Sequence, residues 1–418
     1  MDFKLTDGVD LHVISTPQFK TNQILINFST QQSKKNITAR SLLADLLETS
    51  THKYPTQTAL ARQMSSLFGA YVGTNVTRMG NLHTLRVRAS FVNDQYAVAG
   101  LTDQIIDLLH EMIFHPLIDN DSFDEPTFTL QRNNLQSSIK ALADDKQFYA
   151  GMQLRDLYFK DGSLLKIPSF GQLSDLPKLS AESLVTTYRD MVVNDRINIV
   201  VLGNVDEQHI AEEFSQFEFQ PRSASFGPLF YQQTPIIEPK RKQQTQKLNQ
   251  AKLNLAYQLP IYYQEKDYYA SLVMNGILGG SPLSKLFVNV REKASLAYYA
   301  SSQHNAFNGL FSIQTGIQSE NRKQVERLIQ DQVTAVMQGE FDSELLQEVK
   351  DGIVNQYETG LDISSNIVEQ VLLDKITQSR TDTQILVQEI KAVTASDVVH
   401  VANQLRLQAV YYLNGDLN

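Results

Sequence analysis

Four short segments of the chain carry the pattern of β-strands. Segments 22–29 and 252–258 place an apolar side chain at every second position, and segments 82–90 and 308–317 show a further strand pattern later in each half. A period of two is typical of a half-buried strand, because successive side chains point to opposite faces of a sheet. The pattern therefore predicts strands at these four places.

Helical periodicity marks longer segments. Residues 101–114 and 325–337 repeat apolar side chains at intervals of three or four, which gathers them on one helix face. These positions are Leu101, Ile105, Leu108, Leu109 and Met112 in the first segment, and Val325, Leu328, Ile329, Val333 and Val336 in the second. Further helical stretches are predicted at 41–50 and 59–73 and, in the second half, at 268–280 and 284–299.

The two halves repeat one order of elements. Each has a strand, two helical stretches, another strand and a long amphipathic helix, and each ends in an apolar run with Gly, Asn and an acidic residue, at 197–206 and 409–418. This repetition predicts two duplicated α+β units, each a mainly antiparallel sheet with helices packed on one face. The expected domains are residues 1–217 and 251–418.

Residues 218–250 are predicted to be an exposed linker between the two units. The segment is rich in Pro, Gln, Ser and Lys, and its prolines are Pro221, Pro228, Pro235 and Pro239. Its short basic run, Lys240–Lys242, is interpreted as solvated linker.

Charge and composition narrow the classes of function. The 418 residues carry a net charge of −9, which argues against a nucleic-acid-binding surface because such surfaces concentrate Lys and Arg. The chain has no cysteine, so disulfides and thiolate metal sites are excluded. No apolar run approaches the roughly 20 residues of a membrane span, and no signal peptide is visible. We therefore expect a soluble cytoplasmic protein with no membrane association.

Several motifs resemble known catalytic or metal sites without meeting their requirements. His110 and His115 are five residues apart, whereas the zinc-binding helix motif needs histidines at i and i+4, so ordinary residues near a helix end are favoured. The acidic clusters Asp119–Asp124 and Asp144–Asp145 lack calcium-loop spacing, and surface charge is favoured there. There is no G-x-S-x-G elbow, and the Gly-rich segment 276–281 lacks the Lys of a phosphate-binding loop.

Arg291 and Tyr298 are a more informative pair. They are seven residues apart, so one continuous helix would place both on the same face, whereas a helix that ends near residues 294–295 would put Tyr298 in the next strand. A guanidinium and a phenol are hydrogen-bond donors that can polarise a carbonyl oxygen and stabilise an oxyanion. By composition alone, an ordinary structural role for both residues is favoured.

Nearly the whole chain resembles the pitrilysin/insulinase family of zinc peptidases, the inverzincins, which includes the mitochondrial processing peptidase and its non-catalytic partner subunits. The strongest match is GILGGSPLSKLFVNVREKASLAYYASS at 276–302. The resemblance implies a clamshell arrangement of the two units. It also implies that Arg291 and Tyr298 contact a substrate carbonyl near zinc, and that Gly279, Gly280 and Ser281 contact the substrate.

The first half departs from this family at its zinc motif. Active members carry H-x-x-E-H before a segment like Lys-Tyr-Pro, and a Glu ligand on a later helix. When Lys53-Tyr54-Pro55 is used as the anchor, the positions of His, Glu and His fall on Ser41, Ala44 and Asp45, and the later ligand falls on Ser138. These residues cannot replace the imidazole and carboxylate ligands that catalytic zinc prefers, so no metal cofactor is expected in this chain.

Two hypotheses follow from this resemblance. In the first, the chain is the zinc-free subunit of a heterodimeric peptidase and supplies Arg291 and Tyr298 to a homologous H-x-x-E-H partner that holds the zinc. In the second, it is a non-enzymatic subunit that binds peptides or serves as a scaffold. The sequence does not identify the peptide or the pathway.

Overall fold

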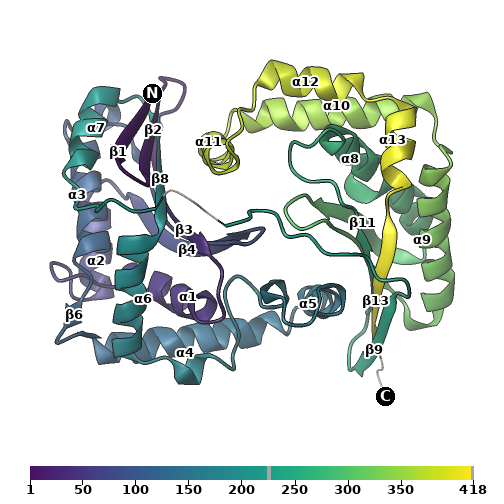
Figure 1. Cartoon of the computed structure of the whole chain (residues 1–418), viewed down its shortest axis with the longest axis horizontal. Coiled ribbons are helices and arrows are strands. Elements are labelled where there is room, and N and C mark those ends of the chain that lie inside the picture. The colour runs from purple at the N-terminus through teal and green to yellow at the C-terminus, as the bar shows by residue number, and fades with distance from the viewer. Residues whose placement is uncertain (224–226, 416–418) are drawn as a thin grey trace. The chain divides into compact units, whose positions relative to one another are not determined.

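The computed structural model describes residues 1–223 and 227–415 and divides the chain into two compact units (Figure 1). Unit 1 contains residues Met1–Lys140, Ile167–Leu229 and Leu361–Arg380, and unit 2 contains Ala141–Lys166, Phe230–Gly360 and Thr381–Asn418. The chain therefore passes between the units several times. Unit 1 includes Leu361–Arg380 from the second half of the sequence, and unit 2 includes Ala141–Lys166 from the first half.

Unit 1 is built on a six-stranded sheet with the strand order β1-β2-β8-β3-β5-β4. All neighbouring strands are antiparallel except β2 and β8, which are parallel. The strands are β1 (Asp2–Thr6), β2 (Val9–Ser15), β3 (Thr21–Gln31), β4 (Tyr71–Met79), β5 (Leu82–Val92) and β8 (Arg196–Gly203), and a small ribbon pairs β6 (Ile118–Asp119) with β7 (Ser122–Phe123).

The main core of unit 1 lies between one face of this sheet and a layer of helices. Ile24, Ile26 and Phe28 of β3 point into this core, as the period-two pattern predicts, whereas Leu25 points to the opposite face. The helices are α1 (Asn36–Leu47), α2 (Gln57–Ser66), α3 (Leu101–Phe114), α4 (Glu125–Leu142), α6 (Ala181–Asn194) and α7 (Glu207–Ser215), with short 3₁₀ turns at Asp94–Tyr96 and Leu176–Lys178.

Unit 2 is built on a five-stranded sheet with the order β11-β12-β10-β13-β9, antiparallel except for the parallel pair β13 and β9. Its strands are β9 (Lys240–Gln246), β10 (Ala251–Gln258), β11 (Ala297–Asn305), β12 (Leu310–Ile317) and β13 (Arg406–Gly415). Its helices are α5 (Lys146–Tyr158), α8 (Tyr268–Asn275), α9 (Arg322–Met337), α10 (Ser343–Gly360), α12 (Thr383–Ala392) and α13 (Ala395–Ala402), with the π-helical segments η4 (Gly276–Gly280) and η5 (Phe287–Lys293) and 3₁₀ turns at Leu164–Lys166 and Ser319–Asn321.

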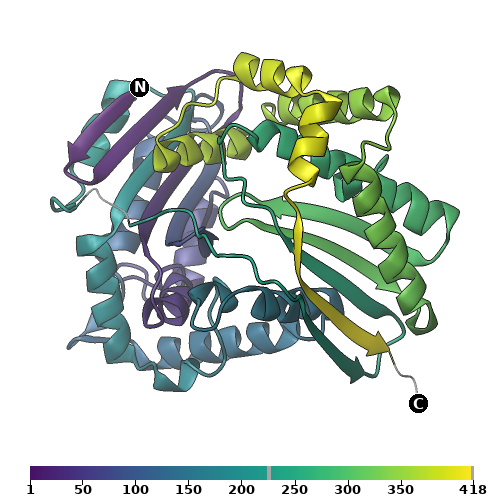
Figure 2. The same ribbon diagram turned by 45° about the vertical axis from the view of Figure 1, so that its right-hand side comes forward.

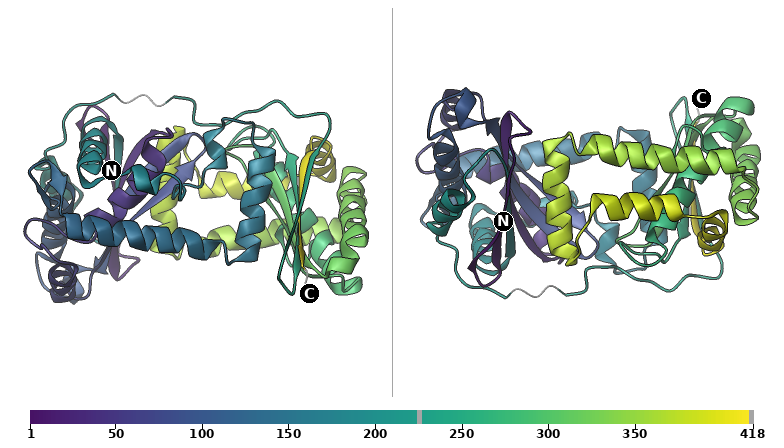
Figure 3. Two further views of the ribbon diagram at one scale, coloured as in Figure 1. Left: turned by 90° about the horizontal axis from the view of Figure 1, so that it is seen from below. Right: turned by 90° about the horizontal axis from the view of Figure 1, so that it is seen from above.

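The α+β class and the mainly antiparallel sheets confirm the sequence prediction. Each sheet also carries one helix on its other face, which the sequence patterns did not reveal. Helix α11 (Ser364–Thr377), yellow-green in Figure 2, covers part of the sheet of unit 1. Helix α5, blue in the left view of Figure 3, packs on β10 and β13 of unit 2 through Ala150, Leu154 and Tyr158.

Local structure departs from several predicted elements, and the last predicted strand runs beyond the described residues. The helix expected over 59–73 ends at Ser66, because Phe68 and Gly69 have φ angles of 58° and 70°, and β4 begins at Tyr71. The segment expected to be linker contains strand β9, at Lys240–Gln246. The last predicted strand, 409–418, is part of β13 up to Gly415, and its residues 416–418 lie outside the described part of the chain.

Candidate functional site

The three zinc-motif positions of the first half lie in α1, a helix that is buried on almost every side. Ten of its twelve residues are buried. Ser41 is 6% exposed and Ala44 is 2% exposed, and Asp45 is half-buried. Strand β4 closes over the end of the helix, since Thr74 Oγ1 donates a hydrogen bond to the carbonyl oxygen of Ala44 at 2.6 Å. The helix predicted from the apolar pattern is confirmed, and it serves as part of the core.

An ion pair next to these positions fixes α1 in place. Arg40 Nη1 lies 2.6 Å from Asp195 Oδ2, and both side chains are 2% exposed. Arg40 Nη2 also donates to the carbonyl oxygen of Phe28 at 3.0 Å. Burial raises the pKa of Asp195 to about 6 despite the opposing effect of Arg40. Loss of either partner would leave an uncompensated buried charge, so this part of α1 tolerates little movement.

Asp45 is the one ionisable residue among the four positions aligned with the family's zinc ligands and catalytic base. Burial and, as a smaller cause, the nearby charge of Glu48 together raise its pKa to about 7. A carboxyl group must lose its proton to bind a metal, so this environment opposes metal binding near neutral pH. Asp45 is therefore a weaker metal ligand than an ordinary surface aspartate.

Ser138, the fourth position, is an exposed residue of α4. Helix α4 lies beside the end of α1, where Gln131 Nε2 donates to Thr49 Oγ1 at 2.8 Å. A set of two serines, an alanine and an aspartate with a raised pKa does not fit zinc, which needs imidazole or carboxylate ligands. Across residues 1–223 and 227–415, no group of three or more His, Cys, Asp or Glu side chains is arranged to hold a metal ion.

The other motifs considered from the sequence have structural roles. Helix α3 ends at Phe114 with His115 as its C-cap, as the following Pro116 predicts. In the acidic clusters, Asp124 accepts a hydrogen bond from the backbone N–H of Thr127 at 3.0 Å, and Asp145 caps α5 through Gln147 and Phe148. These aspartates stabilise helix N-termini, the ordinary use of this residue type.

Arg291 lies in η5 of unit 2 and presents its side chain to solvent. Its guanidinium carbon lies 4.5 Å from the centre of the Phe287 ring, one turn earlier in the same segment. An arginine over an aromatic face is held by a cation–π interaction and loses some of its conformational freedom. π-Helical segments occur frequently at functional sites. The environment therefore suits an arginine that must keep one orientation while its donors stay free for a ligand.

Tyr298 lies in a β-bulge of strand β11. The pairing of β11 with β12 shifts between Ala297 and Tyr299, so Tyr298 is the extra residue on the bulged strand. Its side chain is 56% exposed, and β11 is an edge strand of the sheet. β-Bulges occur often at sheet edges beside active sites, where they redirect a side chain. The neighbouring Tyr299 has a buried hydroxyl, and burial raises its pKa.

The connection between η5 and β11 holds these two residues in one short segment. Of the two arrangements left open by the sequence, the structure has the second: η5 ends at Lys293, and Tyr298 lies in the next strand. Ser295 has a φ of 52°, which breaks the helix, and the N–H of Leu296 donates to the carbonyl oxygen of Val290 at 3.2 Å. This hydrogen bond ties the residue before Arg291 to a residue two positions before Tyr298.

Gly279 and Gly280 have a packing role inside unit 2. A Cβ atom at Gly279 would come within 2.7 Å of the backbone nitrogen of Ser302 in β11, and one at Gly280 within 2.4 Å of Asn275 Nδ2. Ser281 Oγ donates to the carbonyl oxygen of Gly276 at 2.9 Å. Gly279 thus allows η4 to approach β11 closely, and Gly280 leaves room for Asn275 at the end of α8. The substrate contact assigned to Gly279, Gly280 and Ser281 stays a prediction.

Sequence reasoning did not find the aromatic support of Arg291 or the bulge at Tyr298. The i, i+4 spacing of Phe287 and Arg291 was a usable signal, because side chains at that spacing meet on a helix. The bulge had no comparable signal, since it depends on the register of β11 against β12.

Known proteins resemble this chain over its full length. A family model described as "Peptidase M16 inactive domain" matches residues 178–353. A conserved protein from Enterococcus faecalis of known crystal structure is 37% identical, with a TM-score of 0.95, and the match covers 100% of this chain and 99% of that one. The probable inactive metalloprotease YmfF of Bacillus subtilis is 28% identical over 98% of this chain and 96% of its own length.

A more distant crystal structure, described as a peptidase M16 inactive domain from Pseudomonas fluorescens, has the same fold with a TM-score of 0.80 at 16% identity, covering 100% of this chain and 98% of that one. The chain belongs to the M16 family of zinc peptidases, the pitrilysin/insulinase family. Within it, the chain is a peptidase-like protein of the kind named inactive. No helix in the two described ranges has the length and apolar character of a membrane span.

Proposed function

We propose that this chain is the zinc-free subunit of a heterodimeric metallopeptidase that acts on peptides. A homologous partner with an intact H-x-x-E-H motif provides the metal chemistry, and this chain provides Arg291 and Tyr298. One observation carries the proposal: two hydrogen-bond donors of the family's catalytic set are kept here as exposed side chains, on a π-helical segment and a β-bulge.

The chemistry of the two side chains fits this role. As a peptide carbonyl carbon becomes tetrahedral, negative charge develops on its oxygen, and donors already aimed at that oxygen lower the barrier. The guanidinium of Arg291 donates from a rigid fork, while the hydroxyl of Tyr298 adds an O–H donor. Phe287 holds the guanidinium before the substrate arrives, which reduces the cost of orienting it.

Peptides are the proposed substrate class. Strand β11 is an edge strand, so one side of its backbone has no neighbouring strand within the sheet of unit 2. An extended peptide can add to such an edge through main-chain hydrogen bonds. The proposed location is the cytoplasm, supported by the absence of cysteine.

The second candidate function is a non-enzymatic peptide-binding or scaffold subunit. It is favoured by the poor fit of Ser41, Ala44, Asp45 and Ser138 to zinc and needs only the edge of β11. A simple genomic observation separates the two candidates. A neighbouring gene for an H-x-x-E-H homologue of similar size favours the heterodimeric peptidase, and a genome without such a homologue rules it out.

The direct test is reconstitution with that homologue. Zinc content and cleavage of a fluorogenic peptide mixture are measured for each chain alone and for the mixture. We expect no stoichiometric zinc and no cleavage for this chain alone, and cleavage when both chains are present. Arg291→Ala and Tyr298→Phe should each lower turnover by about 10²-fold or more without loss of assembly, the usual effect of removing an oxyanion donor.

Matched controls are available on the same chain. Lys293→Ala removes an exposed cation from the same π-helical segment, and Tyr96→Phe removes the hydroxyl of a tyrosine that is 55% exposed in unit 1. Both should keep wild-type turnover. If Arg291→Ala and Tyr298→Phe assemble and cleave at the wild-type rate, the role assigned to the pair is wrong.

A further inference from the structure

Helix α11 is attached to unit 1 without being continuous with it along the chain. Residues 361–380 belong to unit 1, whereas α10 before them and α12 after them belong to unit 2. The joining residues 361–363 and 378–382 are neither helix nor strand, and Gln378 ends α11 with a φ of 55°. The helices next to α11 in the chain both belong to unit 2. Helix α11 is therefore held on the sheet of unit 1 by noncovalent contacts of its own.

The apolar contact under α11 is smaller than the core on the other face of the sheet, although Ile367 and Val371 of α11 add partly buried side chains to it. Val368, Leu372 and Ile376 form one stripe along the helix and pack on Leu25, Leu82, Val200 and Leu202 of the sheet. The core on the other face of the same sheet joins α1, α3 and α6 to the strands through many more buried side chains. Because apolar stabilisation follows the area buried, α11 depends more on its polar contacts than those helices do.

The main polar contact is made by Glu369. Arg86 Nη1 donates to both of its carboxylate oxygens at 3.0 Å, and Arg88 Nη2 donates to Oε1. The side chain of Arg86 is only 8% exposed, and burial lowers its pKa to about 10. Glu369 is thus the negative charge that compensates two neighbouring arginines on the sheet.

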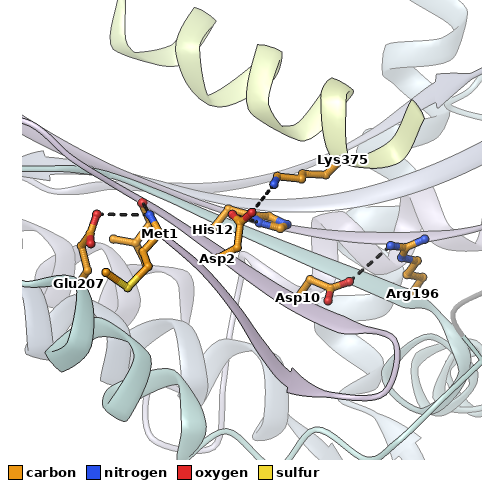
Figure 4. A network of polar contacts seen from close by, with 8 residues as sticks. Met1, Asp2, Asp10, His12, Arg196, Glu207 and Lys375 are labelled. Carbon is orange, nitrogen blue, oxygen red and sulfur yellow. Dashed lines mark hydrogen bonds and ion pairs between the residues drawn. The ribbon is translucent and has the colours of Figure 1, made fainter. Parts of the chain in front are cut away.

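A second polar contact joins the other end of α11 to β1. Lys375 Nζ lies 2.6 Å from Asp2 Oδ2, and Asp2 Oδ1 lies 2.9 Å from His12 Nδ1 (Figure 4). The pKa of Asp2 is lowered, because the hydrogen bonds from Lys375 and His12 outweigh the effect of burial, which raises it. Arg196 Nη2 and Asp10 Oδ2 form a separate pair at 3.4 Å between β8 and β2, which Figure 4 shows near Asp2.

We propose that α11 is an electrostatically held strap, which leaves the sheet of unit 1 as a single helix while the rest of unit 1 stays folded. When α11 is docked on the sheet, the carboxylate of Glu369 pairs with both Arg86 and Arg88. Without its charge, docking holds two like charges close together in a partly buried site, with Arg86 8% and Arg88 32% exposed, whereas release gives both more contact with water. Release also uncovers the apolar side chains Leu25, Leu82, Val200 and Leu202. The proposal does not depend on the peptidase function.

Hydrogen exchange of the full chain, measured by mass spectrometry at one pH, tests the strap. In Glu369→Gln we expect amides of 364–377 to exchange at least about tenfold faster than in wild type, while those of α3 change by less than about twofold. Glu358→Gln, which removes the charge of an exposed residue in α10, is the matched control and should behave as wild type. Lys375→Gln removes the more exposed ion pair, that with Asp2, and should accelerate hydrogen exchange of the α11 amides by about two- to threefold.

Two results would overturn the strap. In one, α11 keeps wild-type protection in both Glu369→Gln and Lys375→Gln. In the other, α11 and α3 lose protection together, because α11 would then be part of a single cooperative core. Lys375→Gln is mild enough to distinguish these results if Glu369→Gln does not fold.

Discussion

Helix α1 of unit 1 and the segment from Phe287 to Tyr298 of unit 2 contain the positions that the sequence resemblance assigns to zinc ligands and to carbonyl-binding donors, and they differ in regularity and in burial. Helix α1 is regular and almost wholly buried, and its motif positions hold Ser41, Ala44 and Asp45. The second segment is π-helical and bulged, and both Arg291 and Tyr298 are exposed.

The difference shows what each region is constrained to do. A buried helix without ligands still contributes apolar area, and Leu42, Leu43, Leu46 and Leu47 of α1 are at most 2% exposed. The π-helical turn and the bulge of the second segment cost backbone regularity and expose an aromatic side chain, so stability alone does not account for them. Conformational irregularity that carries exposed donors points to function, whereas a regular buried helix points to architecture.

The largest effect should come from Ala44→Glu, which restores the charge of the family's catalytic base. Ala44 is 2% exposed, so the carboxylate would be buried without a partner, and we expect a loss of about 3–5 kcal/mol in the free energy of unfolding. Urea unfolding measures it. Ala61→Glu, at an exposed position of α2, is the control and should change stability by about 0.5 kcal/mol or less. Equal losses of stability in the two variants would mean that position 44 is no more buried than position 61.

Gly279→Ala should have the next largest effect, because the added Cβ would meet the backbone nitrogen of Ser302 at 2.7 Å. We expect a loss of about 1–3 kcal/mol in unfolding free energy. Gly352→Ala in α10, where a Cβ meets nothing within 4 Å, should instead stabilise the protein by up to about 1 kcal/mol. A neutral Gly279→Ala would show that η4 does not need its close approach to β11.

Asp45→Asn should stabilise the protein in a pH-dependent way. The folded-state pKa of Asp45 is raised from 3.8 to about 7 by burial and by Glu48, so the wild type loses stability as pH rises through this interval. We expect no difference from wild type at pH 4 and a gain of about 1–3 kcal/mol at pH 8. The exposed Asp119→Asn should show no such pH dependence. A gain that is equal at both pH values would exclude ionisation as the cause.

The smallest effect should come from Phe287→Leu, which keeps an apolar side chain and removes the ring face under Arg291. In the proposed heterodimer we expect a two- to fivefold loss of turnover, equivalent to about 0.5–1 kcal/mol of cation–π interaction. In an Arg291→Ala background the same change should have no effect. An equal loss in both backgrounds would mean that Phe287 acts independently of Arg291.

Much of the architecture could be predicted from the sequence, because it depends on local periodicity. The strands at 22–29, 82–90, 252–258 and 308–317 and the helices at 101–114 and 325–337 all exist, with ends that shift by a few residues. Segments whose secondary structure depends on tertiary contacts were harder to predict. Strand β9 reads as a polar linker because its pattern KRKQQTQ has no apolar face, and only its pairing with β13 makes it a strand.

The features of the candidate site likewise fall into those that follow from residue type and those that depend on tertiary contacts. The residue types at Ser41, Ala44, Asp45 and Ser138 were enough to argue that this chain has no catalytic zinc set, since ligand chemistry follows from the side chain alone. The support of Arg291 by Phe287, the bulge at Tyr298 and the raised pKa of Asp45 depend on packing, register and burial.

The sequence by itself determined the duplicated α+β plan, the family and the absence of an H-x-x-E-H motif, because these depend on residue identity and short-range period. Only the tertiary structure decided which helix lies on which sheet. Helices α5 and α11 each pack on a sheet built mainly from the other half of the chain, and no local pattern records this exchange. The choice depends on long-range contacts, such as Glu369 with Arg86 and Tyr158 with the carbonyl oxygen of Gly309, which form only when distant segments meet.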